Sequence, residues 1–478
     1  MDKYSKRVYL YFLEHMSYPY FVKALTGNQF WKYVKELEEL QFADSEVLLK
    51  RSEERVRRIL NHAYENVPFY KKNFDKYGMT PEDFHFIDDL QKFPIVTKTD
   101  LKQNFPDGVK AINISDERFH LDSTSGSTGV PFQFFIDRNA SSVRQAARIF
   151  FNYWAGISPA SRRIWICSPR PYSASSKKTT SQISLLSLMK RKVKNILLGP
   201  VETHHISSFE INQRNIKEII EFIVCFNPDY IESYASVIVK LARGLQKHHL
   251  QLPQNLKTII STSETLISIE RKLIENAFNC KVTNRYGSRE FTGSVAQSCP
   301  ENNEGFHINT ELVFLEVVGE NGKQVAPGER GKIVITDLHN YAMPFIRYDM
   351  GDYAIRGEQC SCGRGFPILS QIEGRSTESF LTPSGKNVSP TELGQFLFVL
   401  KNYINYIREY QVIQNRINEM QFLVVPEHNF NSSIEKRLQT DLKTFIGEEV
   451  KIDINVVSEI KREVSGKRLI IKSNISQR

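Results

Sequence analysis

The sequence predicts an α/β protein. A large N-terminal domain with parallel-sheet βαβ units and a small antiparallel β subdomain precedes a small C-terminal α+β domain. Short apolar runs alternate with amphipathic helical patterns between residues 164 and 285, a hairpin rhythm replaces them near Leu312, and the pattern changes again at Gly374. A chain of 478 residues is also long enough to bury a large core and to divide into unequal domains.

The first part of the chain is predicted to be helical. Residues 1–50 carry aromatic and charged residues in a helical rhythm, without a motif that indicates a role. Apolar residues then recur at helical spacing over residues 53–64, and Pro68 marks the end of that helix.

The middle of the chain predicts a largely parallel sheet. The expected strands cover residues 163–167, 230–234, 258–261 and 281–284. Helical patterns over residues 216–224 and 237–242 lie between strands. This alternation favours parallel pairing, because each helix returns the chain to the edge from which the next strand starts.

Two later changes of pattern predict the remaining parts. Residues 312–318 and 331–336 read as antiparallel strands, with a glycine-flanked turn at residues 319–322. In the last 100 residues, strands are expected at 409–413, 420–425 and 451–457, with a helix at 434–445. We therefore expect an N-terminal domain of residues 1–373, a hinge at 374–380 and a C-terminal domain of residues 381–478.

Composition and charge limit the class of protein. The 63 basic and 54 acidic residues give a net charge of +9 that is spread along the chain, which suits polyanionic small ligands and does not require nucleic acid. The sequence contains no run of about 18 apolar residues and no secretory leader, so we expect a cytoplasmic protein without a transmembrane segment. The basic run at 190–194 follows an apolar run at 183–189; it predicts either a membrane-touching amphipathic helix or, more commonly, a solvated helix end.

A loop of small residues at positions 123–131 is the clearest chemical motif. Its sequence, STSGSTGVP, alternates hydroxyl-bearing residues with glycines at the edge of an apolar run. Glycines let the backbone approach an anion, and hydroxyl and amide groups supply neutral donors to it. The motif predicts a phosphate-binding loop, and a plain linker is the alternative for the segment taken alone.

Four further motifs follow this loop in a fixed order. They are Tyr-Gly-Ser-Arg-Glu at 286–290, Arg-Tyr-Asp-Met-Gly-Asp at 347–352, Gly-Arg at 374–375 and Gly-Lys at 466–467. In order and rough spacing the five motifs resemble those of the adenylate-forming enzymes. The resemblance is strongest to the phenylacetate-CoA ligase-like branch, including members associated with capsular polysaccharide biosynthesis, and runs from about residue 60 to the C-terminus.

The resemblance implies a role for each motif residue in binding ATP. The β- and γ-phosphates would lie against Ser125, Gly126, Ser127, Thr128 and Gly129. Ser288 occupies the position that contacts the α-phosphate, and Glu290 is the acidic residue associated with Mg²⁺. Tyr286 would lie against the adenine, with Gly287 beside it and with Glu264 in the adenine loop.

The resemblance also implies a catalytic lysine on a mobile small domain. Asp352 matches the residue that accepts hydrogen bonds from the ribose hydroxyls, and Arg375 matches the basic residue beside them. Lys467 matches the lysine that bridges the carboxylate and the α-phosphate and then moves away as the small domain rotates.

Four residues of metal-binding types, three cysteines and one histidine, occur in the loops after these motifs. They are Cys299, His307, Cys360 and Cys362. Thiolates and imidazole suit Zn²⁺, and the resemblance implies a structural zinc site that joins two loops away from the substrate. The alternative is a set of reduced surface cysteines and a free histidine.

Together these features predict an ATP-dependent ligase that forms an acyl-adenylate, releases pyrophosphate and passes the acyl group to a nucleophile. The acceptor is either the coenzyme A thiol or an amine or hydroxyl of a sugar or metabolite in cell-surface polysaccharide biosynthesis. The expected cofactors are ATP, Mg²⁺, structural Zn²⁺ and, for the thioester product, coenzyme A. The alternative is a non-catalytic nucleotide-binding relative that acts in a biosynthetic complex.

Overall fold

The computed structural model describes residues 29–124, 131–158, 161–168, 202–302, 305–375, 378–463 and 465–475. Several predicted features lie wholly or partly outside these residues: residues 1–28 of the expected helical segment, the phosphate loop at 125–129, the apolar and basic runs at 183–194, and residues 376–377 of the expected hinge. Within the described residues, no helix is both long and apolar enough to cross a membrane.

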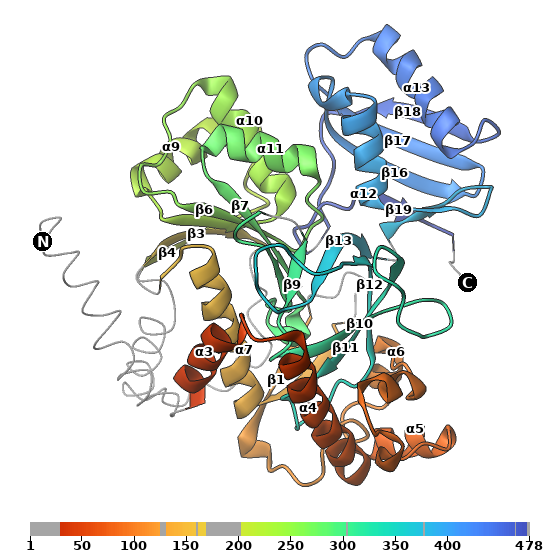
Figure 1. Cartoon of the computed structure of the whole chain (residues 1–478). Coiled ribbons are helices and arrows are strands. Elements are labelled where there is room, and N and C mark those ends of the chain that lie inside the picture. The colour runs from red at the N-terminus through yellow and green to blue at the C-terminus, as the bar shows by residue number, and fades with distance from the viewer. Residues whose placement is uncertain are drawn as a thin grey trace, which may run out of the picture.

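A mixed sheet of eleven strands forms the centre of the large N-terminal part (Figure 1). Its order is β10-β11-β12-β13-β9-β8-β7-β6-β5-β3-β4. The parallel strands are β3 (Arg162–Cys167), β4 (Glu202–Ser207), β5 (Tyr230–Ser233), β6 (Thr258–Thr262) and β7 (Lys281–Tyr286). The antiparallel strands are β8 (Ala296–Ser298), β9 (Phe306–Ile308), β10 (Val313–Val318), β11 (Arg330–Asp337), β12 (Tyr348–Arg356) and β13 (Ile368–Arg375).

Helices cover both faces of the parallel strands. One face packs against α9 (Ile216–Phe226), α10 (Ala235–His248) and α11 (Ser268–Phe278). Alternate residues of the strands, such as Ile231 and Ile259, point into this core because side chains in a strand alternate between faces. The long helix α7 (Arg138–Trp154) lies across the sheet from α9–α11 (Figure 1).

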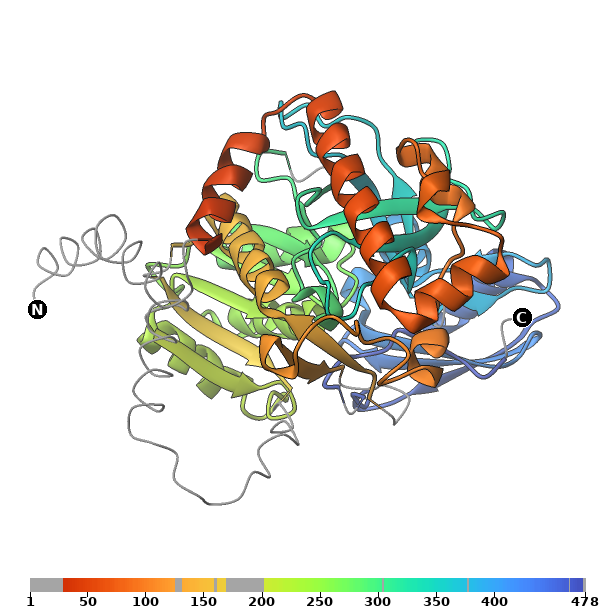
Figure 2. The same cartoon turned by 90° about the horizontal axis from the view of Figure 1, so that it is seen from below.

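Most of the N-terminal helices pack on the antiparallel part of the sheet, while the first of them packs on α7, as the view from below shows (Figure 2). They are α3 (Gln29–Leu40), α4 (Ser45–Asn66), α5 (Pro68–Lys76) and α6 (Lys98–Gln103). A hairpin of β1 (Phe119–Ser123) and β2 (Gln133–Asp137) flanks the predicted phosphate loop.

The C-terminal part has its own sheet and its own core (Figure 1). The sheet order is β18-β17-β16-β19, formed by β16 (Ile407–Arg416), β17 (Glu419–Pro426), β18 (Lys451–Val456) and β19 (Ile471–Ser473). Helix α13 (Ser432–Ile446) packs on it through Leu438 and Leu442, and α12 (Pro390–Gly394) precedes a π-helical turn at Gln395–Leu400. Short strands β14 (Phe380–Leu381) and β15 (Asn387–Val388) begin this part.

The strands and helices that the sequence predicts are confirmed, with small differences at their ends. The helix predicted over residues 53–64 runs from Ser45 to Asn66, because its polar flanks carry no helix-breaking residue until Pro68. The predicted antiparallel strands are present, and they continue the same sheet as the parallel strands through β8 and β9.

Candidate active site

Three predicted nucleotide-binding residues meet where β7 and β13 end, beside the middle of β12. Tyr286 is the last residue of β7, while Asp352 and Arg375 are paired neighbours on β12 and β13. The Tyr286 hydroxyl donates to Asp352 Oδ2 at 2.7 Å, and Arg375 Nε lies 3.9 Å from Asp352 Oδ1. The sheet register thus brings together residues that are 66 and 89 positions apart in the sequence.

The charge of Asp352 depends on these neighbours. Burial raises the pKa of Asp352, while Arg375, the Tyr286 hydroxyl and Lys467 act in the opposite direction. Burial and the nearby Asp352 carboxylate raise the pKa of Tyr286 well above its ordinary value, so its hydroxyl remains a donor. A carboxylate held in this way has a further oxygen that can accept hydrogen bonds from a diol.

The turn after Tyr286 places small residues against the backbone. A Cβ atom on Gly287 would lie 2.6 Å from the carbonyl carbon of Gly293, so only glycine fits there. The hydroxyl of Ser288 is buried and has no hydrogen-bond partner among the residues described. A buried donor without a partner is costly, and an oxygen of a bound ligand would satisfy it.

Glu290 lies just beyond this turn. Its side chain is buried, and its Oε1 accepts a hydrogen bond from the Tyr348 hydroxyl at 3.4 Å. The carboxylate is a hard oxygen donor that fits Mg²⁺.

Lys467 reaches the same region from the small C-terminal part. It lies in the loop between β18 and β19, and its side chain is partly buried. Burial and the Arg375 guanidinium lower the pKa of Lys467. Three carboxylates act in the opposite direction, those of Glu378, Glu264 and Asp352. Lys467 therefore lies within electrostatic reach of the predicted ribose-binding pair.

Glu264 accepts hydrogen bonds from both the large N-terminal part and the small C-terminal part. Its Oε2 accepts from the backbone N–H of Ser236 at 2.9 Å, and its Oε1 accepts from the backbone N–H of Arg468 at 2.7 Å. The guanidinium of Arg462 lies 3.8 Å from Oε1. The structure thus places this predicted adenine-loop residue beside the Lys467 loop, which we define as residues 461–468.

One basic residue of this site was not predicted. Lys98 begins α6, and its ammonium lies 5.2 Å from the centroid of the Phe132 ring. Burial lowers the pKa of Lys98; the Glu290 carboxylate raises it, and the Arg375 guanidinium lowers it. The motif that precedes it, Phe-Pro-Ile-Val-Thr at residues 93–97, ends at a helix start, but a single lysine there carries no chemical signature in the sequence.

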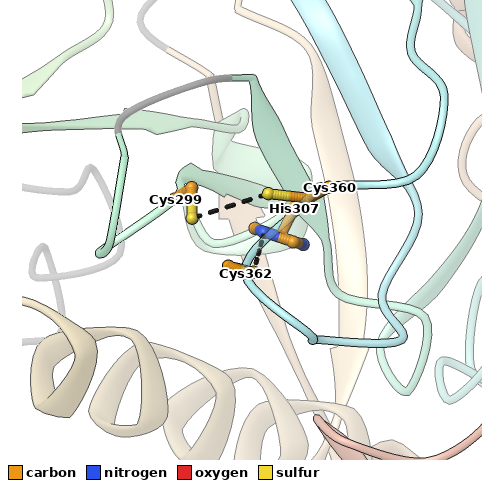
Figure 3. Close-up of side chains that lie close together, drawn as sticks. All are labelled: Cys299, His307, Cys360 and Cys362. Carbon is orange, nitrogen blue, oxygen red and sulfur yellow. Dashed lines mark hydrogen bonds between the residues drawn. The ribbon is translucent and has the colours of Figure 1, made fainter.

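The four predicted metal ligands form a compact cluster (Figure 3). Their ligand atoms all lie within 4.8 Å of one another. The Sγ atoms of Cys299 and Cys360 are 3.7 Å apart, and Cys362 Sγ lies 3.3 Å from His307 Nε2. A tetrahedral Zn²⁺ with bonds of about 2.0–2.3 Å would place its ligand atoms at similar separations. His307 Nδ1 lies 2.9 Å from the Phe366 carbonyl oxygen, a contact that orients Nε2 toward the cluster.

The fold is that of the adenylate-forming CoA ligases. The structure of 2-hydroxyisobutyryl-CoA ligase in the postadenylation state, in complex with R3-HIB-AMP, matches with a TM-score of 0.71 at 19% identity, covering 91% of this chain and 92% of that one. The same enzyme in the thioesterification state, with 2-HIB-AMP and CoA, matches with a TM-score of 0.57 at 21% identity, over 91% and 92% of the two chains.

Sequence comparison leads to the same branch. The phenylacetate-coenzyme A ligase of Thermus thermophilus is 27% identical over 84% of this chain and 87% of its own length. The protein CapK of Staphylococcus aureus is 23% identical over 95% and 94%. Residues 380–474 match the family described as the CapK C-terminal domain. The predicted resemblance to the phenylacetate-CoA ligase-like branch is confirmed, and the relatives named as CoA ligases support the class of an ATP-dependent acid ligase.

Proposed function

We propose that this protein uses ATP to convert a carboxylic acid to an acyl-adenylate and then transfers the acyl group to a nucleophile. The observation that carries the proposal is the convergence of Lys467 with Tyr286, Asp352 and Arg375, beside the unpartnered hydroxyl of Ser288. A cation, a diol acceptor and a free neutral donor are the groups that such a reaction requires around the ribose and the α-phosphate.

In the first half-reaction, a carboxylate oxygen of the acid attacks the α-phosphorus. The bond from the α-phosphorus to the bridging oxygen breaks, and pyrophosphate leaves with that electron pair. Asp352 accepts hydrogen bonds from the ribose hydroxyls, while Ser288 donates to an α-phosphate oxygen. Lys467 stabilises the negative charge that is shared between the carboxylate and the α-phosphate.

The remaining nucleotide contacts follow from the motifs. Residues 125–129 hold the β- and γ-phosphates, while Tyr286 and Gly287 lie against the adenine. Arg375 lies beside the ribose. Glu290 supplies an oxygen ligand for Mg²⁺, which when bound neutralises charge on the phosphates.

Of the two predicted acceptors of the acyl group, we favour the coenzyme A thiol. This choice is supported by the relatives named as phenylacetate-coenzyme A ligases and by the CoA ligases among the similar structures. The match of residues 380–474 to the CapK C-terminal domain supports the second version, in which an amine or hydroxyl accepts the acyl group in cell-surface polysaccharide biosynthesis in the cytoplasm.

The domain arrangement supports an adenylating conformation. We propose that residues 381–478 rotate about a hinge at 374–380 relative to residues 1–373, and so carry Lys467 away after the first half-reaction. The chain matches the postadenylation structure with a higher TM-score than the thioesterification structure, which agrees with the position of Lys467 near Asp352.

We further propose that Cys299, His307, Cys360 and Cys362 hold a structural Zn²⁺. These four side chains would supply all four ligands of a tetrahedral Zn²⁺, which would leave no ligand position for a substrate. The metal would join the loop after β8 to the loop between β12 and β13.

The test measures pyrophosphate release from ATP and Mg²⁺ with a panel of aromatic, fatty and amino acids, using hydroxylamine to trap the activated acyl group. We expect acid-dependent release that falls about 10²-fold or more in Lys467→Ala, the scale for loss of one charge-stabilising group. Lys461→Ala is the matched control, because Lys461 is exposed in the same loop.

Adding coenzyme A, or an amine or hydroxyl donor, in place of hydroxylamine separates the two acceptors. ATP binding without pyrophosphate release for any acid would instead favour a non-catalytic nucleotide-binding protein.

A further inference from the structure

The Lys467 loop contacts the large N-terminal part through Arg462, Ser465 and Arg468. The Tyr234 hydroxyl donates to the Ser465 carbonyl at 3.2 Å, and Arg462 Nη1 donates to Ser236 Oγ at 3.1 Å. Arg462 Nη1 also donates to the Gly466 carbonyl at 3.0 Å, which ties the loop to itself at the point of contact.

Glu264 is the central group of this contact. It is a single buried carboxylate, and its two oxygens accept backbone N–H groups from different parts of the chain. One is Ser236 in the first turn of α10, and the other is Arg468, the residue directly after Lys467. The N-terminus of α10 and the guanidinium of Arg462 place positive charge beside the Glu264 carboxyl group. The side chain of Glu264 is only 8% exposed, so solvent competes weakly for these bonds.

Each of the two hydrogen bonds is made to a different carboxylate oxygen of Glu264. The side chain therefore acts on the position of the backbone beside Lys467, because both of its oxygens already accept a backbone N–H in this conformation. A charge-assisted hydrogen bond to a backbone N–H contributes more than a neutral one, so its loss affects how often the loop is docked.

We propose that Glu264 is a positioning residue that fixes the Lys467 loop on the large N-terminal part for the first half-reaction. The inference rests on the proposed function, since it assigns Glu264 to the docking of the lysine rather than to adenine binding. It follows that Glu264 acts only while the small domain is docked and makes no contribution once the domain rotates.

The test compares Glu264→Gln with the unaltered protein in three measurements on the full chain. Glutamine has the same size, but only one of its polar atoms can accept a hydrogen bond, so one of the two N–H donors loses its partner. We expect the hydroxylamine-trapped rate at saturating ATP to fall about 10–100-fold, the range for loss of a hydrogen bond to a charged group. ATP affinity measured by calorimetry should change less than about twofold, and amide exchange of peptides that contain Arg468 should speed up.

Glu275→Gln is the matched control. Glu275 also accepts a backbone N–H, from Val282 at 3.0 Å, and pairs with an arginine in the same part of the molecule. It does not contact the Lys467 loop, so exchange at Arg468 and the trapped rate should both stay unchanged.

Two results would overturn the proposal. One is a loss of ATP affinity in Glu264→Gln that matches the loss of rate. That result would mean that Glu264 contributes to adenine binding. The other is unchanged exchange at Arg468. If the unaltered protein activates no acid at all, the proposed function fails, yet the exchange comparison still decides whether Glu264 docks the loop.

Discussion

The cysteine cluster and the Lys467 loop both join distant residues, but they depend on different kinds of contact. In the cluster, His307 lies on β9 and Cys299 directly follows β8, while Cys360 and Cys362 lie in the loop that joins β12 to β13 of the same sheet, where β9 pairs with both β8 and β13. The Lys467 loop instead belongs to a separate sheet and reaches the site through hydrogen bonds and ion pairs between two cores. The cluster can be lost only by local unfolding, whereas the loop can leave its place with both cores intact.

Replacing a cluster cysteine should therefore affect stability more than chemistry. We expect Cys299→Ser to lower the free energy of unfolding by about 3–5 kcal/mol, because loss of a structural metal ranks among the largest single-site effects. Cys299 is fully buried, so the variant also leaves a polar group without its partner. Urea denaturation and metal content by mass spectrometry are the measurements.

Cys225→Ser controls for the loss of a thiol as such, because Cys225 is an exposed free cysteine. Its metal content and unfolding midpoint should match those of the unaltered protein. A protein that is purified without zinc, and whose stability does not respond to added zinc or to Cys299→Ser, would contradict a structural metal site.

The same contrast explains what the sequence could predict. Short apolar runs predicted the strands around the site, since every residue of β5 and all but the last of β6 are buried, and such continuous burial favours an apolar run in the sequence. Tyr286, Asp352 and Lys467 were predicted from the order and rough spacing of the motifs in which they lie.

Contacts to backbone groups could not be predicted in this way. Glu264 binds the N–H of Arg468, and every residue except proline carries such a group. The two residues are 204 positions apart, and only the docking of one core on another brings them together. Lys98 was missed for a similar reason, because its proximity to Glu290 arises from packing of α6 near β12.

The second prediction concerns Gly466, where the Lys467 loop passes closest to the large N-terminal part. Its φ is +79°, and a Cβ atom there would lie 2.8 Å from both Ser168 Cβ and Ser208 Oγ. We expect Gly466→Ala to disfavour the docked loop by about 1–3 kcal/mol, since an added methyl group in a packed interface causes strain of that size. The hydroxylamine-trapped rate should fall about 10–100-fold, with ATP affinity unchanged.

Gly385→Ala is the control that separates the effect of contact at the interface from the effect of backbone strain. Gly385 lies in the same small domain with a φ of +84°, but a Cβ atom there would meet nothing within 4 Å. This variant carries a similar backbone strain and should keep the trapped rate. Equal losses of rate in both variants would mean that backbone strain, and not contact with Ser168 and Ser208, disables the loop.

The smallest expected effect belongs to the hydrogen bond between Tyr286 and Asp352. Tyr286→Phe keeps the ring that is proposed to lie against the adenine and removes only the donor to Asp352. We expect a loss of about 1 kcal/mol, or roughly fivefold in ATP affinity, as for one neutral donor.

This variant should also shift the pH dependence of activity in a defined direction. The hydroxyl lowers the pKa of Asp352 against the effect of burial, so its removal raises that pKa further. Because the ionised form of Asp352 is the one proposed to bind the ribose, activity should begin to fall at a higher pH in Tyr286→Phe as the solution is acidified. Tyr403→Phe is the matched control, because the Tyr403 hydroxyl donates to Asp441 at 2.8 Å in the small domain, far from the nucleotide. An acid limb that stays at the same pH in Tyr286→Phe would show that Asp352 does not titrate in the active complex, and its role at the ribose would then need another explanation.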